Sequence, residues 1–221
     1  MTAIDRAFLR MRSSPFLHRF ALFTRILLAA GFLPTGLVKL LGQRFTTMGA
    51  DLTIGADLTI GTFFETLYQT GLYWRFIGLS QVLAAILLLI PRLAHLGAAL
   101  FLPIVLNILV ITISLSFRGT PVVALLMLLA TVFLCAWDYH RFRGLLTTAP
   151  LARTVPQQRL DPWERAGFSL FAASLLGFFG VTRSLMPSGI GQLFVLTGVA
   201  AGLLTLGRFA WTSLFGSGLS S

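Results

Sequence analysis

Residues 21–42 read ALFTRILLAAGFLPTGLVKLLG, a stretch that is apolar except for Arg25 near one end and Lys39 near the other. About 20 apolar residues in a helix are enough to cross the hydrocarbon core of a bilayer. The stretch is longer than the core of a signal peptide and lacks a convincing cleavage site, so we interpret it as a retained helix. It predicts that the chain is a membrane protein.

The composition of the whole chain supports this prediction. Its 221 residues are 56% hydrophobic and only 11% charged, whereas a soluble domain of this length needs far more polar surface. In a soluble protein, the net charge of +10 would suggest nucleic acid as a partner. Here the basic residues lie at the ends of apolar stretches, so membrane lipids with anionic headgroups are the expected partners and nucleic acid is not. Cys135 is the single cysteine and cannot form an internal disulfide.

Six apolar stretches predict an all-α polytopic membrane protein with six transmembrane helices. Turns that contain proline and glycine separate several of them, such as Arg118-Gly119-Thr120-Pro121 between the third and the fourth. The segment Asp161-Pro162-Trp163-Glu164 has the pattern of a helix start, with a capping Asp, proline at the first helical position and Glu three residues after the cap. The expected spans are residues 21–42, 73–90, 94–117, 121–137, 166–186 and 190–211.

The distribution of arginine predicts the orientation in the membrane. Arginines on the side of the termini outnumber those on the other side by eleven to three, and such an excess marks the cytoplasmic side. Both termini are therefore expected in the cytoplasm, and the bacterial inner membrane is the expected location. The eleven are Arg6, Arg10, Arg12, Arg19, Arg92, Arg141, Arg143, Arg153, Arg159, Arg165 and Arg208, and the three are Arg44, Arg118 and Arg183.

The same patterns divide the chain into five segments. In the basic amphipathic N-terminus, residues 1–20, the apolar side chains of Ile4, Phe8 and Met11 recur at helical spacing. This segment is either a short helix on the inner leaflet or a frayed tail. It is followed by a four-helix membrane unit (21–143), a cytoplasmic linker (144–165), a transmembrane hairpin (166–211) and a flexible tail (212–221).

Residues 50–61 repeat the hexapeptide Ala-Asp-Leu-Thr-Ile-Gly in tandem. Surface loops tolerate insertions, so a small duplication in an outer loop is expected rather than a functional device. The aromatic residues that follow, Phe63-Phe64 and those within 68–74, suit the outer interface of a membrane.

In the segments TRILLAAGF (24–32) and GLVKL (36–40), an arginine near the inner end of the first span precedes an apolar run that closes with a glycine and a lysine. This pattern resembles the first helix of DoxX-like membrane proteins. The resemblance continues in RFIGLSQ (75–81), in LLLIPRLA (87–94), in the third span and in Trp137-Asp138-Tyr139. It covers residues 20–143, and the last two spans lie outside it as an appended hairpin.

The resemblance implies a four-helix bundle and a broad range of roles. The family includes a membrane subunit of thiosulfate:quinone oxidoreductase and bacterial proteins linked to oxidative-stress complexes, and it is similar to eukaryotic cargo receptors and receptor-assembly chaperones. Many members have an acidic residue near the position of Gln81. The glutamine here argues against carrying over a proton-linked or redox-linked role for that position.

Polar side chains within spans are costly in a bilayer, so each needs an explanation. Arg25 and Lys39 are 14 residues apart, which places them within roughly 40° of each other around the helix. Each side chain can snorkel to its own interface. Alternatively, both pair with acids, Arg25 with Asp138 on the inner side and Lys39 with Glu65 on the outer side.

Gln81 and Asn107 are expected near the middle of the membrane, about 12 and 15 Å below the outer ends of their spans. Pro34 reaches a similar depth and frees a backbone carbonyl, and Pro103 loosens the third span near Asn107. A pocket lined by these amides, with Lys39 nearby, suits a quinone headgroup or another small polar group. The alternative is an interhelical hydrogen bond that only helps the bundle to pack.

The histidines and the cysteine give little indication of a cofactor held by this chain. His18, His95 and His140 lie near the cytoplasmic side, which argues against a transmembrane bis-histidine haem. His95, His140 and Asp138 together suit a metal or proton site, but loop histidines at membrane interfaces are common, so no metal site is expected. The sequence contains no Cys-x-x-Cys motif, which argues against thiol–disulfide exchange.

Small residues at helical spacing mark the last two spans. Gly198 and Gly202 in the sixth span, and Ser169, Ala173 and Gly177 in the fifth, form faces suited to close helix contact. These faces either pack on each other or contact a partner subunit or a second copy of the chain.

Three hypotheses for function follow. The first is an accessory or quinone-facing subunit of a membrane redox complex, in which Gln81, Asn107 and Lys39 orient the ligand and the Arg25–Asp138 pair fixes the bundle. No redox centre is evident on the chain, so its electrons would come from a protein partner or a bound cofactor. The second is a non-catalytic scaffold or assembly factor that docks a client on the C-terminal hairpin. The third is a small-solute transporter, which the lack of an inverted repeat and of an acidic residue at midplane depth makes weaker.

Overall fold

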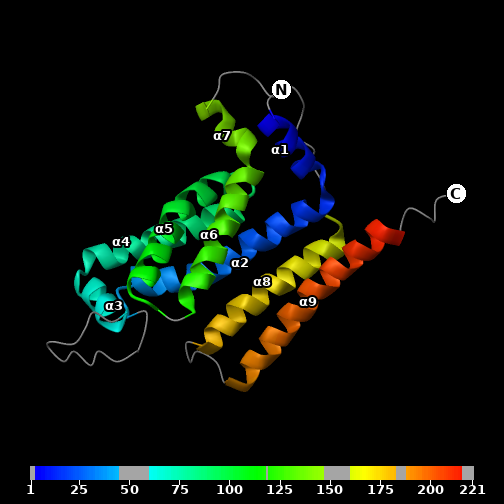
Figure 1. Cartoon of the computed structure of the whole chain (residues 1–221). Coiled ribbons are helices and arrows are strands. Elements are labelled where there is room, and N and C mark those ends of the chain that lie inside the picture. The colour runs from blue at the N-terminus through cyan, green and yellow to red at the C-terminus, as the bar shows by residue number, and fades with distance from the viewer. Residues whose placement is uncertain (1–2, 45–59, 118, 147–159, 183–187, 216–221) are drawn as a thin grey trace. The chain divides into compact units, whose positions relative to one another are not determined.

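The computed structural model describes residues 3–44, 60–117, 119–146, 160–182 and 188–215. Regular secondary structure in these ranges is entirely α-helical, which confirms the expected all-α class (Figure 1). The tandem repeat at 50–61 and the expected tail at 212–221 lie largely outside them. The helices are α1 (Ala3–Ser13), α2 (Pro15–Leu40), α3 (Ile60–Gln69), α4 (Leu72–Leu89), α5 (Ala94–Ser114), α6 (Thr120–Trp137), α7 (Tyr139–Leu146), α8 (Pro162–Thr182) and α9 (Ser188–Phe215).

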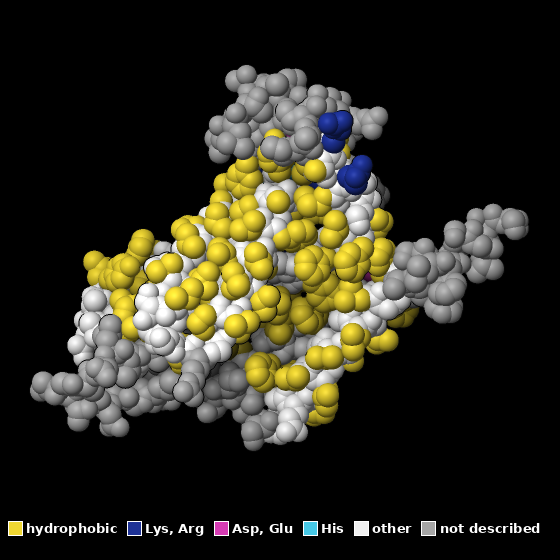
Figure 2. All heavy atoms as spheres, viewed as in Figure 1, with side chains coloured by type: hydrophobic (Ala, Val, Ile, Leu, Met, Phe, Trp, Pro, Cys, Tyr) yellow, Lys and Arg dark blue, Asp and Glu magenta, His cyan; other side chains and the backbone are white. Residues whose placement is uncertain are grey.

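Five helices in the described residues are long and apolar enough to cross a membrane: α2, α4, α5, α6 and the segment Gly189–Gly207 of α9. Their mean hydropathy ranges from 1.7 to 2.5, and hydrophobic side chains cover much of the face shown in Figure 2. These features are consistent with a polytopic α-helical membrane protein. Helix α8 is not among the five, and residues 183–186, which complete the expected fifth span, lie outside the described ranges. The expected span 190–211 corresponds to α9, whereas the span 166–186, and with it the count of six spans, remains a prediction, as does the cytoplasmic location of the termini.

Most helix boundaries follow from the sequence pattern. Helices α4, α5 and α6 correspond to the expected spans 73–90, 94–117 and 121–137. Helix α2 begins earlier than expected, at Pro15, because the Ser14 hydroxyl accepts a hydrogen bond from Leu17 N at 3.4 Å and proline suits a first helical turn. The N-terminal segment forms α1, and its contact with a membrane surface remains a prediction.

Helix α8 begins as the sequence predicts. The Asp161 side chain accepts a hydrogen bond from Glu164 N at 2.7 Å, and the Glu164 side chain accepts one from Asp161 N at 3.0 Å. This reciprocal capping box satisfies two amide groups that the start of a helix leaves without intrahelical partners, and Pro162 occupies the first helical position. The predicted capping box is thus confirmed.

The chain forms two compact units. Unit 1 comprises residues 1–23 and 153–221, and unit 2 comprises residues 24–152. Helix α2 contributes its residues up to Phe23 to unit 1 and the rest to unit 2. The expected N-terminal segment therefore groups with the expected C-terminal hairpin, and unit 2 contains most of the expected four-helix unit.

In unit 1, helices α8 and α9 lie side by side and approach closely at small residues (Figure 1). An added Cβ at Gly198 would lie 2.7 Å from Ser174 Cβ, and one at Gly177 would lie 2.5 Å from Phe194 Cδ1. Larger side chains at these two glycines would therefore push the helices apart. Gly202 is buried as well.

The face that α8 turns toward α9 differs in part from the expected one. Ser169 and Ala173 are exposed, whereas Gly177 and Ser174 are buried. Residues four apart drift around a helix axis by about 40° per step, so a stripe read at that spacing leaves the contact surface after a few turns. For this reason Ser174, and not Ala173, meets Gly198.

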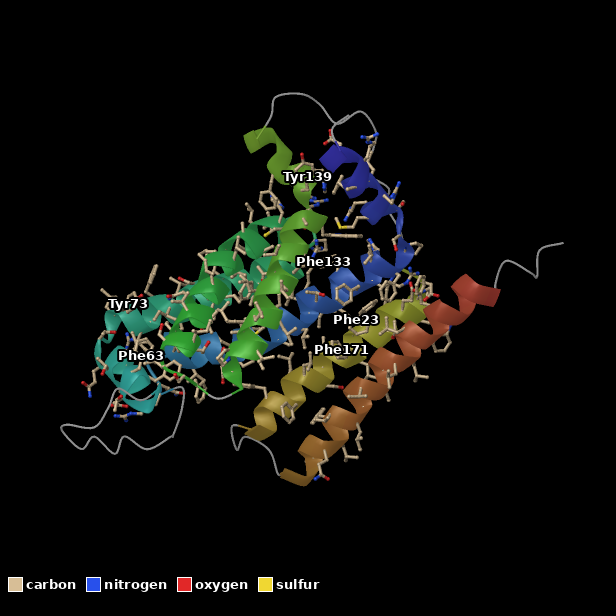
Figure 3. The ribbon with its side chains drawn as sticks, viewed as in Figure 1. Phe23, Phe63, Tyr73, Phe133, Tyr139 and Phe171 are labelled. Atoms are coloured by element: carbon tan, nitrogen blue, oxygen red, sulfur yellow. The ribbon has the colours of Figure 1, made fainter. Side chains whose placement is uncertain are left out.

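The start of α2 is fixed to both C-terminal helices of unit 1. Arg19 Nε donates to Glu164 Oε1, on the same carboxylate that caps α8, and the Arg19 guanidinium lies 4.0 Å from the ring centroid of Phe209 in α9. Farther along α2, the rings of Phe23 and Phe171 make an edge contact at 5.0 Å (Figure 3). Glu164 thus connects the start of α2 to the start of α8.

We predict that Glu164 stabilises unit 1 through both of its contacts. Glu164→Leu should lower the free energy of unfolding by about 2–4 kcal/mol, because it leaves the partly buried Arg19 without its acid and removes half of the capping box. Thermal unfolding of the full chain in mild detergent measures the change. Arg165→Leu alters an exposed side chain in the same turn and should have little effect. Equal destabilisation by the two variants would contradict the prediction.

Candidate functional site

Unit 2 contains a cavity of about 950 Å³ that is lined by residues of α2, α3, α4, α5 and α6. Small-molecule sites in proteins typically have volumes of roughly 300–1,000 Å³. Most of the wall is aromatic or aliphatic. The polar side chains that interrupt it include Thr35, Lys39, Ser80, Gln81, Asn107 and Thr112.

The polar part of the wall depends on a close contact between α2 and α4. An added Cβ at Gly78 would overlap the backbone of Leu40 and would lie 2.6 Å from Gly36 O, and one at Gly36 would lie 3.0 Å from Gly78 O. Gly78 therefore has no room for a side chain, and Gly36 has little. Lys39 and Gln81 each follow one of these glycines by three residues, which places them on the same helix faces and brings their side chains together.

Lys39 and Gln81 form a buried hydrogen-bonded pair. Lys39 Nζ lies 3.1 Å from Gln81 Oε1, 3.4 Å from Thr35 O and 5.6 Å from the ring centroid of Trp74. The exposed fractions of Lys39 and Gln81 are only 5% and 4%. A buried ammonium group without acceptors is costly, so the surrounding helices must keep acceptors close to Lys39 Nζ.

The pair fixes the direction of the Gln81 amide. Because an ammonium group only donates, the atom of Gln81 that faces Lys39 must be the oxygen. The NH₂ group of Gln81 is then the remaining polar group, and it makes no hydrogen bond to another described residue. Since Gln81 lines the cavity, it supplies that wall with a hydrogen-bond donor.

The other expected pocket residues divide into two groups. Asn107 and Pro103 in α5 line the same cavity as Gln81 and Lys39. Pro34 is buried in α2 and does not line it. Asn107 is exposed, and its amide makes no hydrogen bond within the described residues, so it does not form the interhelical bond considered as an alternative.

Helix α3 forms part of the cavity wall. Phe63, Phe64 and Leu67 line the wall from this helix. Figure 3 shows Phe63 at the same end of the unit as Tyr73, which lines the cavity from α4. The aromatic residues that the sequence placed at a membrane interface thus also contribute to the cavity wall.

Arg44 holds α3 in place. Arg44 Nε and Nη2 donate to the two carboxylate oxygens of Glu65 at 3.0 and 2.9 Å, and the guanidinium lies 4.5 Å from the ring centroid of Tyr68. These hydrogen bonds hold the pKa of the Glu65 carboxyl below its ordinary value, and Glu65 raises the pKa of Arg44.

The expected pair of Lys39 with Glu65 is therefore replaced by two other contacts. Glu65 binds Arg44, and Lys39 binds Gln81. Lys39 still belongs to α2, where the contact at Gly78 directs it toward α4, whereas Arg44 follows the end of that helix and reaches α3. Helix packing thus determines which of the two cations pairs with Glu65.

Unit 2 contains a second ion pair, which lies close to Thr24, where the unit begins within α2. Arg25 Nη2 donates to Asp138 Oδ2 at 2.6 Å, which is the pairing that the sequence suggested. Asp138 follows the end of α6 and is only 5% exposed. His95 lies nearby with its ring centroid 5.9 Å from that of Phe142, and the described residues contain no group of three His, Cys, Asp or Glu side chains that could hold a metal ion.

Comparisons with known proteins place the chain in a family. No protein-family model matches it, and no solved structure matches it. The protein YwoB of Bacillus subtilis (strain 168), described as uncharacterized, is 35% identical to the chain over 128 residues, which are 58% of the chain and 82% of YwoB. The chain belongs to the YwoB family. Because YwoB is uncharacterized, this relation assigns no activity, ligand or partner, and membership of the DoxX-like family stays a prediction.

We predict that the glycine contact controls the assembly of the cavity wall. Gly78→Leu should lower the stability of unit 2 by about 1–3 kcal/mol, because the added side chain overlaps the backbone of α2. Unfolding of the full chain in mild detergent measures this effect. Gly207→Ala in α9 is a control with nothing within 4 Å of the added Cβ. A Gly78 variant as stable as this control would contradict the close contact.

We also predict that α3 loosens in acid. A carboxyl with a lowered pKa in the folded chain contributes stability above its ordinary pKa, and this contribution is lost as the pH falls through the lowered value. Spin labels on Thr66→Cys in α3 and Leu79→Cys in α4, in a Cys135→Ala background, report the separation of the two helices. Its distribution should be narrow at neutral pH and should broaden as the pH falls below the ordinary pKa of glutamate, about 4.3.

The control for this pH experiment is Glu65→Gln, which cannot ionise. Its distance distribution should be broad at every pH, because the amide cannot form the ion pair with Arg44. A distribution that stays narrow in the unaltered chain down to pH 2 would contradict the role of Glu65.

Proposed function

We propose that the chain is an inner-membrane, DoxX-like protein that holds a quinone for a membrane redox complex, as an accessory or quinone-facing subunit. The observation that carries the proposal is the buried Lys39–Gln81 pair in the wall of a mostly apolar cavity. A site that takes up a lipid-soluble molecule needs an apolar wall with a few placed polar groups, and this cavity has both.

The chemistry of a quinone suits these groups. Its carbonyl oxygens accept hydrogen bonds, and the NH₂ group of Gln81 donates them. Its flat ring packs well against aromatic side chains, of which Phe32, Phe64 and Trp74 line the cavity. Its apolar tail suits the aliphatic wall that Ile104, Ile108 and Ile111 form on α5.

The proposed role is one of binding rather than of electron transfer by the chain itself. The sequence has a single cysteine and no Cys-x-x-Cys motif. In this proposal the electrons reach the quinone from a partner subunit, while Lys39 and Gln81 position its headgroup. The orientation of the chain with its termini in the cytoplasm belongs to the same proposal and is supported by the arginine distribution.

The direct test is to purify the full chain in mild detergent and to quantify bound quinone by mass spectrometry. Gln81→Leu should lower the bound fraction about tenfold at limiting quinone, which corresponds to one hydrogen bond of about 1.4 kcal/mol. Gln192→Leu makes the same change at an exposed position of α9 and should have no effect.

Two results would count against this function. One is the absence of quinone from the purified chain, together with no binding of added quinone. The other is an equal loss of quinone in the Gln81 and Gln192 variants. A stoichiometric protein partner without any quinone would instead favour the scaffold or assembly role.

A further inference from the structure

We infer that the cavity is loaded sideways from the bilayer, through an opening between α4 and α5, by a molecule that combines an apolar tail with a hydrogen-bond-accepting headgroup. This inference rests on the proposed function because it concerns the same cavity. It adds the route by which the ligand enters and the requirement for a tail.

Residues on both helices mark the rim of this opening. Five residues that line the cavity are exposed, and four of them belong to these helices, Tyr73 and Phe76 of α4 and Pro103 and Asn107 of α5; the fifth is Gly31 of α2. The exposed fractions of Tyr73 and Phe76 are 50% and 59%. A side chain that lines a cavity and is also exposed lies where the cavity meets the surface. In this inference that part of the surface faces lipid, because α4 and α5 are both candidate membrane spans.

The opening lies in the half of the α4–α5 hairpin that is away from its connecting turn. Near that turn the two backbones are in close contact, since an added Cβ at Gly97 would lie 2.5 Å from Leu88 N and 2.9 Å from Ala84 O. The rim residues come earlier in α4 and later in α5, so they lie toward the other end of the hairpin. The contact at Gly97 fixes the closed end, and the cavity opens beyond it.

Asn107 places a polar amide group at the rim of the opening. Its amide is exposed on a helix that suits a membrane span, and it makes no hydrogen bond within the described residues. An amide in contact with hydrocarbon is costly, and a polar headgroup that passes between the helices would satisfy it. Gln81 lines the same cavity at a buried position, with an exposed fraction of 4%. A headgroup entering here would therefore meet one amide at the rim and a second one inside.

Helix α3 makes entry from water the less suitable route. It contributes Phe63, Phe64 and Leu67 to the cavity wall, and the two hydrogen bonds between Arg44 and Glu65 hold it. Entry that displaces α3 would strain this ion pair. Entry between α4 and α5 would leave it intact, so the two routes can be separated by locking α3.

The experiment locks α3 and measures how fast a quinone binds. Arg44→Cys and Glu65→Cys, in a Cys135→Ala background, are joined by a bismaleimide about as long as the original ion pair. The full chain in lipid nanodiscs is mixed with a decyl-tailed benzoquinone, and the quenching of tryptophan fluorescence is followed in time. Trp74 lines the cavity and reports arrival of the ring, and the Trp74→Phe variant identifies its share of the signal.

Lateral loading predicts the same binding rate with and without the cross-link. A rate that falls about tenfold or more on cross-linking would show that α3 is the gate and would overturn the inference. Binding that occurs at equal rates supports both the route and the ligand class. No quenching in either form would overturn the proposed function itself, which distinguishes the two failures.

A second variant tests the rim directly. Asn107→Leu should slow binding of the decyl-tailed quinone by roughly threefold. This factor corresponds to the average free energy of an intramembrane hydrogen bond, about 0.6 kcal/mol. Ser114→Leu, at an exposed polar position of α5 that does not line the cavity, should leave the rate unchanged. Equal rates for the Asn107 variant and the unaltered chain would contradict the role of Asn107 at the opening.

Discussion

A lysine buried between two apolar helices is the constraint on which the candidate site depends. An ammonium group at 5% exposure must be surrounded by acceptors, and Lys39 reaches the side-chain oxygen of Gln81, the backbone oxygen of Thr35 and the ring of Trp74. The contact with Gln81 exists only because α2 and α4 touch at Gly78, where any side chain would collide with the backbone of α2. The lack of a side chain at one position therefore determines the polar chemistry at another, one helical turn away.

Two ion pairs lie at helix ends, unlike the buried hydrogen bond between Lys39 and Gln81. Arg19 pairs with Glu164 in unit 1, and Arg25 pairs with Asp138 in unit 2, across 145 and 113 residues of sequence. Both acids lie at helix ends, Glu164 in the first turn of α8 and Asp138 just after α6. Helix α6 is a candidate membrane span, and at the end of such a span the ionisation of Asp138 costs less than it would at midplane depth. Helix α2 thus supplies an arginine to each unit, while the polar contact inside unit 2 is made with a neutral amide.

Local patterns in the sequence predicted the helices well, because helix length, caps and turns depend on neighbouring residues. The start of α8 follows from Asp161 and Glu164 alone, and α4 to α6 follow from apolar length bounded by proline and glycine. Choices between similar partners could not be predicted in this way. Glu65 was expected to pair with Lys39, but Arg44, just beyond the end of α2, reaches Glu65 instead. Ser174, and not the expected Ala173, contacts α9, because residues spaced four apart drift around the helix and leave the contact face. Gly36 and Gly78 are far apart in sequence, and nothing in the sequence around either glycine predicts that the two are in contact.

The identity of residue 81 limits what the proposed quinone site can do. The oxygen of Gln81 accepts a hydrogen bond from Lys39, and its NH₂ group can only donate. Neither group takes up a proton at neutral pH, so Gln81 can hold a quinone carbonyl but cannot act as a base toward the reduced, protonated form. An acid at this position would titrate and would change its interaction with Lys39 on each proton transfer. The amide instead keeps the same hydrogen bonds throughout, which suits a subunit that positions the ring while another protein moves the electrons.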